Sequence, residues 1–356
     1  MINVTKTYLP PLDEYIKYLE RIWESGWVTN NGELVQELER QLADYLDVPF
    51  VSFVSNGTIA LQLALKALDI QGEVITTPFS YVATTNAILW ENCVPVFVDI
   101  EEENFCIDPD KIEAAITDQT SAIMAVHVYG YPCNVGCLKE ISQKHNLRII
   151  YDAAHAFGCK LNNVSVLRYG DISTLSFHAT KVFHTAEGGA VISHTAEMAE
   201  KLNLLKSFGH RNDDYFLSGI NAKNTEIHAA MGLCVLPKVD DLIKRRKTIW
   251  DLYSHYLRDI SLRYPRNIEG LTYNYSYFPI VLESEGQLVR INADLNQEDI
   301  FPRRYFYPAL NKLPFVNGND CPIAEDLSKR VLCLPFYPEL NEAQVQKISR
   351  IVSNLC

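Results

Sequence analysis

The chain has no apolar run long enough to suggest a membrane span. No segment of its 356 residues approaches the roughly 20 uninterrupted apolar residues that a spanning helix needs. Residues 1–6 also lack the apolar core of a secretory signal peptide. We therefore expect a cytoplasmic protein that has no membrane partner.

Basic residues are fewer than acidic residues in this chain. The sequence has 32 Lys and Arg against 44 Asp and Glu, which gives a formal net charge of −12 at pH 7. This excess of acid disfavours nucleic acid and anionic membrane surfaces as main partners, because both repel a negative protein. An anionic ligand would have to meet local positive charge.

Paired cysteines of the kind that hold metals or disulfides are also missing. The nine cysteines are scattered, and only Cys133 and Cys137 lie close together, which is a weak zinc signal without a second pair. An odd number of cysteines in a chain without an export signal is typical of free thiols. We predict no metal site.

What the sequence does contain is a regular alternation of short apolar runs with amphipathic segments such as 57–68 and 109–115. The apolar runs are consecutive rather than alternating, as in strands covered on both faces. This pattern predicts an α/β fold with a mainly parallel seven-stranded sheet. The expected strands are 50–54, 73–76, 94–98, 122–128, 147–151, 174–177 and 190–193.

The pattern changes in the last third of the chain. A long helical stretch runs from Glu226 towards Tyr253, with a break or kink expected at Pro237. A strand is expected near 277–282 and a closing helix over 341–355. We predict a large α/β domain over residues 1–240 and a small C-terminal α+β domain over residues 241–356.

Two groups at predicted strand ends suggest chemistry. Asp152 ends the strand 147–151, where ligands bind in parallel α/β sheets, and Lys181 lies in a polar loop after the strand 174–177. Each alone is more commonly a turn residue or a solvated side chain. Together they fit pyridoxal phosphate, whose pyridine nitrogen a carboxylate keeps protonated and whose aldehyde reacts with an amine.

A turn that could hold a phosphate precedes the first central helix. Asn56, Gly57 and Thr58 follow the strand 50–54 and open the helix, so that free backbone N–H groups and the positive helix end point at one spot. Gly57 lets the backbone come close, and the Thr58 hydroxyl can donate. A plain N-cap is the alternative interpretation.

These motifs resemble one enzyme family. D-A-A-H-A at 152–156, S-F-H-A-T-K at 176–181 and E-G-G at 187–189 resemble the hallmarks of the DegT/DnrJ/StrS sugar aminotransferases, and the similarity extends over almost the whole chain. The resemblance implies the fold type I of pyridoxal 5'-phosphate-dependent aminotransferases. It also implies that Lys181 bonds the cofactor and shuttles a proton, while Asp152 keeps the ring cationic.

The resemblance implies a set of cofactor contacts. The turn 56–58 and Ser176 would hold the phosphate, Tyr81 would stack on the pyridine ring, and His155 would lie near the phenolic oxygen or the ring face. The implied cofactor-binding residues are Asn56, Gly57, Thr58, Tyr81, Asp152, His155, Ser176, Lys181 and Asn221.

Asn221 implies a partner chain. Residues 219–226 resemble the family motif G-x-N-x-K/R-M-x-E, in which the Asn reaches across a dimer interface to the neighbour's cofactor phosphate. The resemblance therefore implies a homodimer with shared active sites. Asn224 replaces the usual Met of the motif, which leaves the local packing open.

Substrate contacts are implied at both ends of the chain. Residues 27–32 resemble a loop that approaches the sugar, and residues 301–308 resemble a segment that lines the sugar nucleotide. The arginine fork suits a diphosphate, but exposed ion pairing is the commoner fate of neighbouring arginines, so the choice between the two stays open. The implied residues are Trp27, Thr29, Asn31, Arg303, Arg304, Tyr305 and Tyr307.

The resemblance implies ping-pong transamination from L-glutamate to a dTDP-linked 4-keto-6-deoxyhexose. The product would be dTDP-4-amino-4,6-dideoxyglucose, for O-antigen or another surface polysaccharide. Amination of a 3-ketosugar is the nearest alternative, because turning the hexose changes which carbon meets the cofactor. A sugar dehydratase of the same fold would carry His in place of Lys181, and a non-catalytic sensor would need no reactive lysine.

Overall fold

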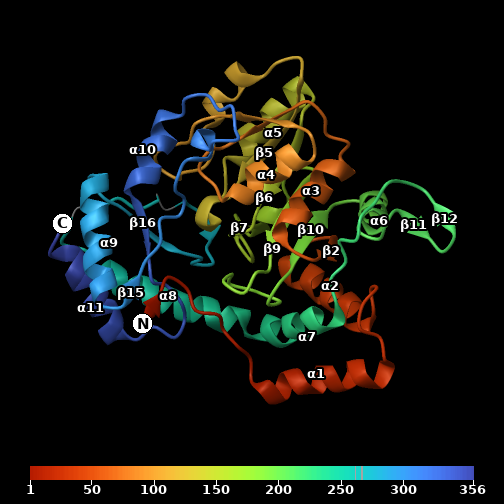
Figure 1. Ribbon diagram of the computed structural model, residues 1–356, viewed down its shortest axis with the longest axis horizontal. Coiled ribbons are helices and arrows are strands. Elements are labelled where there is room, and N and C mark those ends of the chain that lie inside the picture. The colour runs from red at the N-terminus through yellow and green to blue at the C-terminus, as the bar shows by residue number, and fades with distance from the viewer. Residues whose placement is uncertain (261, 266–267) are drawn as a thin grey trace.

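The computed structural model describes residues 1–260, 262–265 and 268–356. A seven-stranded sheet with the order β2-β10-β9-β6-β5-β3-β4 forms its centre (Figure 1). Neighbouring strands are parallel except at β10, which runs antiparallel to β2 and β9. The strands are β2 (Phe50–Val54), β3 (Glu73–Thr76), β4 (Val94–Phe97), β5 (Thr120–Val126), β6 (Arg148–Asp152), β9 (Ile172–Ser176) and β10 (Gly189–Ser193). The predicted mainly parallel sheet is confirmed.

The consecutive apolar residues of these strands pack on both faces of the sheet. Along β6, Ile149 and Tyr151 belong to one apolar cluster, whereas Ile150 between them belongs to another. Both faces are therefore buried, which explains why the strands show no polar alternation. Helices that flank the sheet are α2 (Glu33–Leu46), α3 (Gly57–Ala67), α4 (Val82–Trp90), α5 (Val135–His145) and α6 (Ala196–Leu205).

Two predicted elements differ from the structure. The expected helix over 109–115 is two 3₁₀ turns, η1 (Pro109–Lys111) and η2 (Glu113–Ala115), with Pro109 and Ile112 buried. Short connecting segments commonly form 3₁₀ turns of this kind. The strand expected to reach residue 128 ends as β5 at Val126. The 3₁₀ turn η3 (Val128–Gly130) follows, with Tyr129 at a φ of 55°.

The C-terminal elements gather on one side of the sheet, at the left in Figure 1. The long helical stretch breaks at Pro237, as predicted, into α7 (Glu226–Val235), η5 (Leu236–Lys238) and α8 (Val239–Tyr256). The strand β14 (Phe278–Val281) pairs antiparallel with β16 (Val331–Leu334). The remaining helices of this side are α9 (Glu285–Gln297), α10 (Pro322–Arg330) and α11 (Glu342–Ser353), with η6 (Leu310–Lys312) between α9 and α10.

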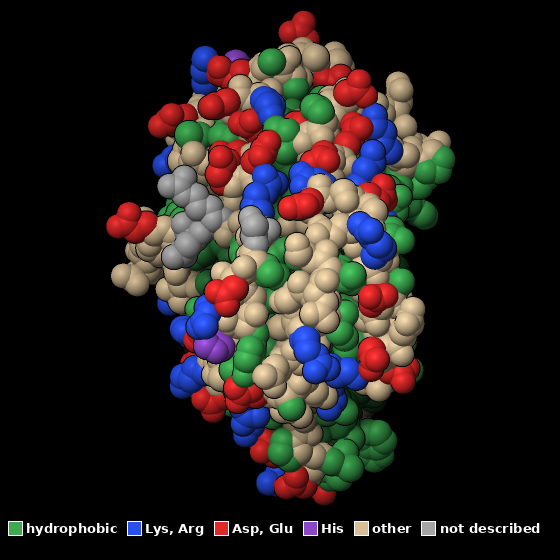
Figure 2. All heavy atoms as spheres, turned by 90° about the vertical axis from the view of Figure 1, so that its left-hand side faces the viewer, with side chains coloured by type: hydrophobic (Ala, Val, Ile, Leu, Met, Phe, Trp, Pro, Cys, Tyr) green, Lys and Arg blue, Asp and Glu red, His purple; other side chains and the backbone are tan. Residues whose placement is uncertain are grey.

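The first strand also belongs to this side. β1 (Ile2–Asn3) pairs parallel with β15 (Ile300–Phe301), so that the N-terminus lies among C-terminal elements (Figure 1). Ile2 packs against their apolar cluster, which includes Tyr253 and Phe278. On the face turned to the viewer in Figure 2, acidic and basic side chains are interspersed. The division of the chain at residue 240 stays a prediction.

Peripheral elements complete the chain. The helix α1 (Leu12–Ser25) lies against α7, and the hairpin of β11 (His210–Arg211) and β12 (Asp214–Tyr215) projects from the body on the side opposite the C-terminal elements (Figure 1). Among the described residues, no helix has both the length and the apolarity to span a bilayer. The other short elements are β7 (Lys160–Leu161), β8 (Val164–Ser165), the 3₁₀ turn η4 (Val166–Arg168) and β13 (Leu271–Thr272).

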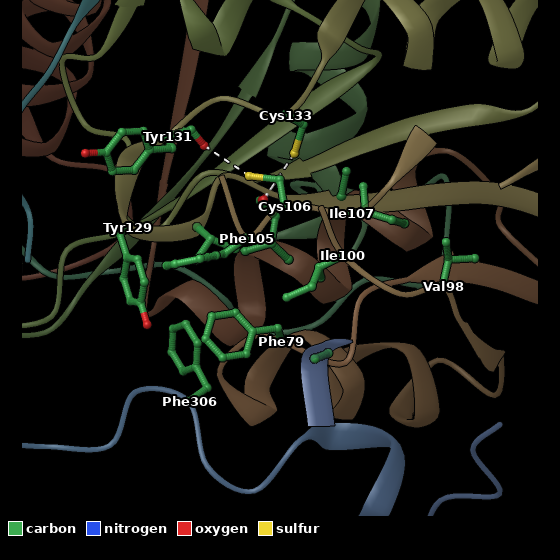
Figure 3. Close-up of a cluster of buried hydrophobic side chains, with 14 of the residues drawn as sticks. Phe79, Val98, Ile100, Phe105, Cys106, Ile107, Tyr129, Tyr131, Cys133 and Phe306 are labelled. Atoms are coloured by element: carbon green, nitrogen blue, oxygen red, sulfur yellow. Dashed lines mark hydrogen bonds between the residues drawn. The ribbon is translucent and has the colours of Figure 1, made fainter. Parts of the chain in front are cut away.

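An aromatic cluster joins the sheet to the C-terminal segment. Phe79, Tyr129 and Phe306 come from distant parts of the sequence and pack together (Figure 3). The Tyr129 ring lies 5.8 Å from the Phe306 ring, with an interplanar angle of 10°. This packing places residues 303–306 near the carboxyl ends of the central strands, where the predicted site residues Asp152 and Lys181 lie.

Candidate active site

A cavity of about 310 Å³ opens where β6 and β9 end and where α3 and α4 begin. Carboxyl ends of parallel strands and amino ends of helices meet there, which is the usual ligand position in α/β sheets. Of the residues predicted to hold a cofactor, those that line this cavity are Asn56, Gly57, Thr58, Tyr81, Asp152, His155, Ser176 and Lys181.

The Asp152 carboxylate is buried and held in place by two hydrogen bonds. Thr84 Oγ1 donates to Asp152 Oδ2 at 2.8 Å, and the Ala154 N–H donates to Oδ1 at 3.1 Å. Burial raises the pKa of Asp152, and these hydrogen bonds and the Lys181 charge oppose that rise. The side chain is only 6% exposed, so an opposite charge in the cavity would stabilise its ionised form.

Lys181 lies in the loop between β9 and β10 and faces the same cavity. Its amine is 6.0 Å from the centroid of the Tyr277 ring. Burial lowers the pKa of Lys181 to about 8, although Asp152 and Tyr81 favour the charged form. A much larger share of this amine is therefore neutral and nucleophilic near pH 8 than of an ordinary lysine.

The amino end of α3 forms one wall. Asn56 caps the helix through Oδ1, which accepts from the Ile59 N–H at 2.9 Å. A Cβ on Gly57 would lie 2.9 Å from Ser176 Cβ, so that only glycine allows the turn to rest on β9. The cap interpretation thus holds for Asn56, while the Thr58 and Ser176 side chains line the cavity beside the helix end.

His155 is fixed in one tautomer. Its Nδ1 accepts the Tyr129 N–H at 3.2 Å, and burial lowers the pKa of His155 well below the ordinary value. The neutral ring therefore carries its proton on Nε2. Tyr277 packs edge-on against this ring at 4.9 Å, and Phe306 lies parallel to it at 5.7 Å.

The structure separates the two candidate arginines. Arg303 lines the cavity with its guanidinium 4.9 Å from the centroid of the Tyr305 ring. Arg304 instead pairs with Glu285 at 2.7 Å and lies 3.5 Å from the centroid of the Tyr307 ring. Arg303 and Tyr305 are therefore at the site within one chain, and Arg304 and Tyr307 are not.

The amino-terminal loop and Asn221 also lie outside the cavity lining of the single chain. Trp27, Thr29 and Asn31 are exposed, as is Asn221. Glu226, the first residue of α7, holds the amino-terminal loop in place through backbone hydrogen bonds. Its N–H donates to the Val28 carbonyl at 2.9 Å, and its carboxylate accepts from the Leu34 and Val35 N–H groups at 2.7 and 3.0 Å.

Sequence reasoning missed several residues of the site. Thr84 holds Asp152, Tyr129 sets the His155 tautomer, and Tyr277 and Phe306 line the cavity. Thr84 follows Tyr81 by one helical turn, which was the only local signal available. Phe306 lies within the segment 301–308 that the resemblance placed near the substrate, although it was not singled out. Tyr129 and Tyr277 reach the site through tertiary packing.

A half-buried lysine and a buried carboxylate that share a cavity at the carboxyl edge of a mainly parallel seven-stranded sheet define a fold type I aminotransferase. The profile of the DegT/DnrJ/EryC1/StrS aminotransferase family matches residues 12–353. The chain belongs to this family, whose members and structural neighbours are pyridoxal phosphate-dependent sugar aminotransferases.

Relatives match along nearly their full length. A Shigella dysenteriae protein named dTDP-4-amino-4,6-dideoxy-D-glucose transaminase is 45% identical over 350 residues, which cover 96% of this chain and 95% of the relative. An Escherichia coli protein of the same name is 42% identical, with coverages of 99% and 98%. The crystal structure of DesI in the presence of its TDP-sugar product is 31% identical, has a TM-score of 0.93, and covers 99% of this chain and 92% of DesI.

Proposed function

We propose that this chain binds pyridoxal phosphate and transfers the amino group of L-glutamate to a dTDP-linked 4-keto-6-deoxyhexose, which yields dTDP-4-amino-4,6-dideoxyglucose. The observation that carries the proposal is the cavity shared by Lys181 and Asp152. The choice of sugar is supported by the names of the relatives at 45% and 42% identity.

The residues around the cavity fit the cofactor at each of its polar ends. The amino end of α3, Thr58 and Ser176 would take the phosphate, Asp152 the ring nitrogen, and Lys181 the aldehyde. Tyr81, which is 53% exposed and lines the cavity, offers a flat face to the ring. A glycine at position 57 lets the turn rest against Ser176, which keeps both beside the cavity.

The bound cofactor supplies an aldehyde that takes up the amino group and a ring that withdraws electrons. Asp152 keeps a proton on the ring nitrogen, and Thr84 keeps Asp152 in place. The Lys181 amine, once released, accepts the proton from the donor's α-carbon and later returns a proton to the sugar carbon. The same residues serve both half reactions, so ping-pong kinetics should result.

Cofactor uptake should depend on the protonation of Lys181. Below pH 8 the amine is mostly charged and cannot attack the aldehyde, and above pH 8 it is mostly neutral. We expect the second-order rate of pyridoxal phosphate incorporation into the apoprotein to rise with pH and to reach half its maximum near pH 8, where burial places the pKa of Lys181 at about 8. Stopped-flow absorbance measures this rate. A midpoint near 10.5, the ordinary lysine value, would contradict the assignment.

Arg303 should contribute to sugar nucleotide binding, and Arg304 should not. Loss of a charge-assisted hydrogen bond costs about 1.5–3 kcal/mol. We expect Arg303→Gln to raise KM for the sugar nucleotide about 10- to 100-fold with little change in kcat. Arg304→Gln is the matched control, because its guanidinium is engaged by Glu285. Steady-state kinetics measures KM for both variants. A larger rise in KM for Arg304→Gln than for Arg303→Gln would show that Arg304 is the residue that binds the sugar nucleotide.

The identity of the sugar is tested by product analysis. Purified protein is incubated with glutamate and either a 4-keto or a 3-keto dTDP-6-deoxysugar, and the product is identified by NMR. The proposal expects turnover of the 4-ketosugar at least about 100-fold faster, a difference of about 2.8 kcal/mol in the barrier. Preference for the 3-ketosugar would select the alternative reaction.

A homodimer with shared sites is part of the proposal. Asn221 is exposed at the base of the β11–β12 hairpin and does not line the cavity of its own chain, which supports a role in a neighbouring chain. A verified monomer should therefore lose cofactor affinity, as measured by absorbance titration. The proposed location is the cytoplasm, and the proposed use of the product is in O-antigen or another surface polysaccharide.

A further inference from the structure

The buried side chain of Asn224 lies where three backbone segments meet. It is 5% exposed and stands just before α7. Lys223 forms an isolated antiparallel bridge with Val54 at the end of β2, and Val54 in turn pairs with Gly189 at the start of β10. The end of β2, the start of β10 and the segment before α7 are thus held together at this point.

The Asn224 amide uses both of its hydrogens on this junction. Its Nδ2 donates to the Val54 carbonyl and to the Glu187 carbonyl, each at 3.1 Å, and its Oδ1 accepts from the Thr225 N–H at 2.9 Å. Val54 immediately precedes the turn 55–58, and Glu187 ends the loop that carries Lys181. One side chain therefore connects both segments.

The two connected segments also touch each other. A Cβ on Gly189 would lie 2.5 Å from the carbonyl carbon of Asn56, so that the turn rests directly on the start of β10. Thr185 Oγ1 donates to the same Glu187 carbonyl at 2.8 Å, from within the Lys181 loop. Because contact is this close, a small change at Asn224 alters the position of the turn relative to the loop.

We propose that Asn224 is a positioning residue that holds the phosphate-binding turn in register with the loop that carries Lys181. This inference rests on the proposed function, which places the cofactor phosphate at the turn and its aldehyde at Lys181. Pyridoxal phosphate must contact the turn with its phosphate and Lys181 with its aldehyde at the same time. Pyridoxal, which lacks the phosphate, needs only the contact with Lys181. Asn224 therefore governs the preference for the phosphorylated ligand.

The test compares the two ligands in an Asn224→Leu variant. Leu has a similar size but donates to neither carbonyl, and both carbonyls lose a buried partner. Apoprotein is titrated with pyridoxal phosphate and with pyridoxal, and the dissociation constants are read from visible absorbance. We expect Kd for pyridoxal phosphate to rise about 10-fold. Kd for pyridoxal should change less than about twofold, which is the usual deviation from additivity between independent sites.

A matched control separates positioning from general stability. Asn311 is also a buried Asn, and its Nδ2 donates to the Asn319 carbonyl and to Glu325 Oε1, both at 2.8 Å, outside the cavity lining. Asn311→Leu should lower Tm without altering the ratio of the two dissociation constants. If Asn224→Leu does not fold, Asn224→Ser, which can donate to one carbonyl, should give an intermediate ratio.

The inference would be overturned if the Asn224 variants raised Kd for both ligands by the same factor, or if their Kd for pyridoxal phosphate were unchanged. Failure of the wild-type protein to bind pyridoxal phosphate would refute the proposed function instead. The two failures are therefore distinguishable in one set of titrations.

Discussion

Replacing Lys181 with Ala should abolish transamination and remove the visible absorbance of the protein treated with pyridoxal phosphate. The variant loses both the amine that bonds the aldehyde and the group that moves the proton, and proton transfer alone contributes about 10²–10⁴-fold to a rate. We expect kcat to fall by more than about 10⁴-fold. The visible spectrum and a coupled glutamate assay measure the two effects separately.

A buried lysine outside the site provides the control. Lys206 is 3% exposed and pairs with Glu39 at 2.8 Å, and it does not line the cavity. Lys206→Ala should reduce stability because the ion pair is lost. The folded fraction of this variant should still show the visible absorbance band after treatment with pyridoxal phosphate. A Lys181→Ala protein that retained the band or measurable turnover would require another residue to carry the chemistry.

Asp152→Asn should preserve the shape of the site and still lower kcat by about 10²–10⁴-fold. An amide is neutral and cannot keep the ring nitrogen protonated in a place where burial makes charge pairing strong. The amide oxygen can accept from Thr84 or from the Ala154 N–H but not from both, so the side chain keeps one of its two hydrogen bonds. We expect the absorbance band to form, because Lys181 is intact, while the single-turnover rate with glutamate falls.

Asp99 offers a comparison of equal burial. It is 6% exposed, and its carboxylate accepts from the Ile323 and Ala324 N–H groups at 2.9 Å, outside the cavity lining. Asp99→Asn should weaken the amino end of α10 and lower Tm with normal single-turnover rates. Near-normal rates in Asp152→Asn would show that the carboxylate is not needed for catalysis.

Features with local causes could be predicted from the sequence. All seven central strands were found because each is short, apolar and ended by a polar turn. Asp152 and Lys181 could be singled out because Asp152 ends such a strand and Lys181 lies in the loop that follows another. The break at Pro237 and the closing helix were also expected, since both depend on adjacent residues. The structure adds a capping box at Asn341 to that helix.

Features with distant causes could not be predicted. The role of Thr84 depends on α4 lying beside the end of β6, and the difference between Arg303 and Arg304 depends on Glu285 from α9. Neither pairing leaves a periodic signal. The predicted roles of Asn221 and of the loop at Trp27 depend on a second chain, so they stay predictions.

The pairing of β1 with β15 has a consequence for how the protein is made. Ile2 pairs with Ile300, so the first strand leaves the ribosome long before its partner exists and must remain unpaired until then. Closing this contact is a late event in biosynthesis.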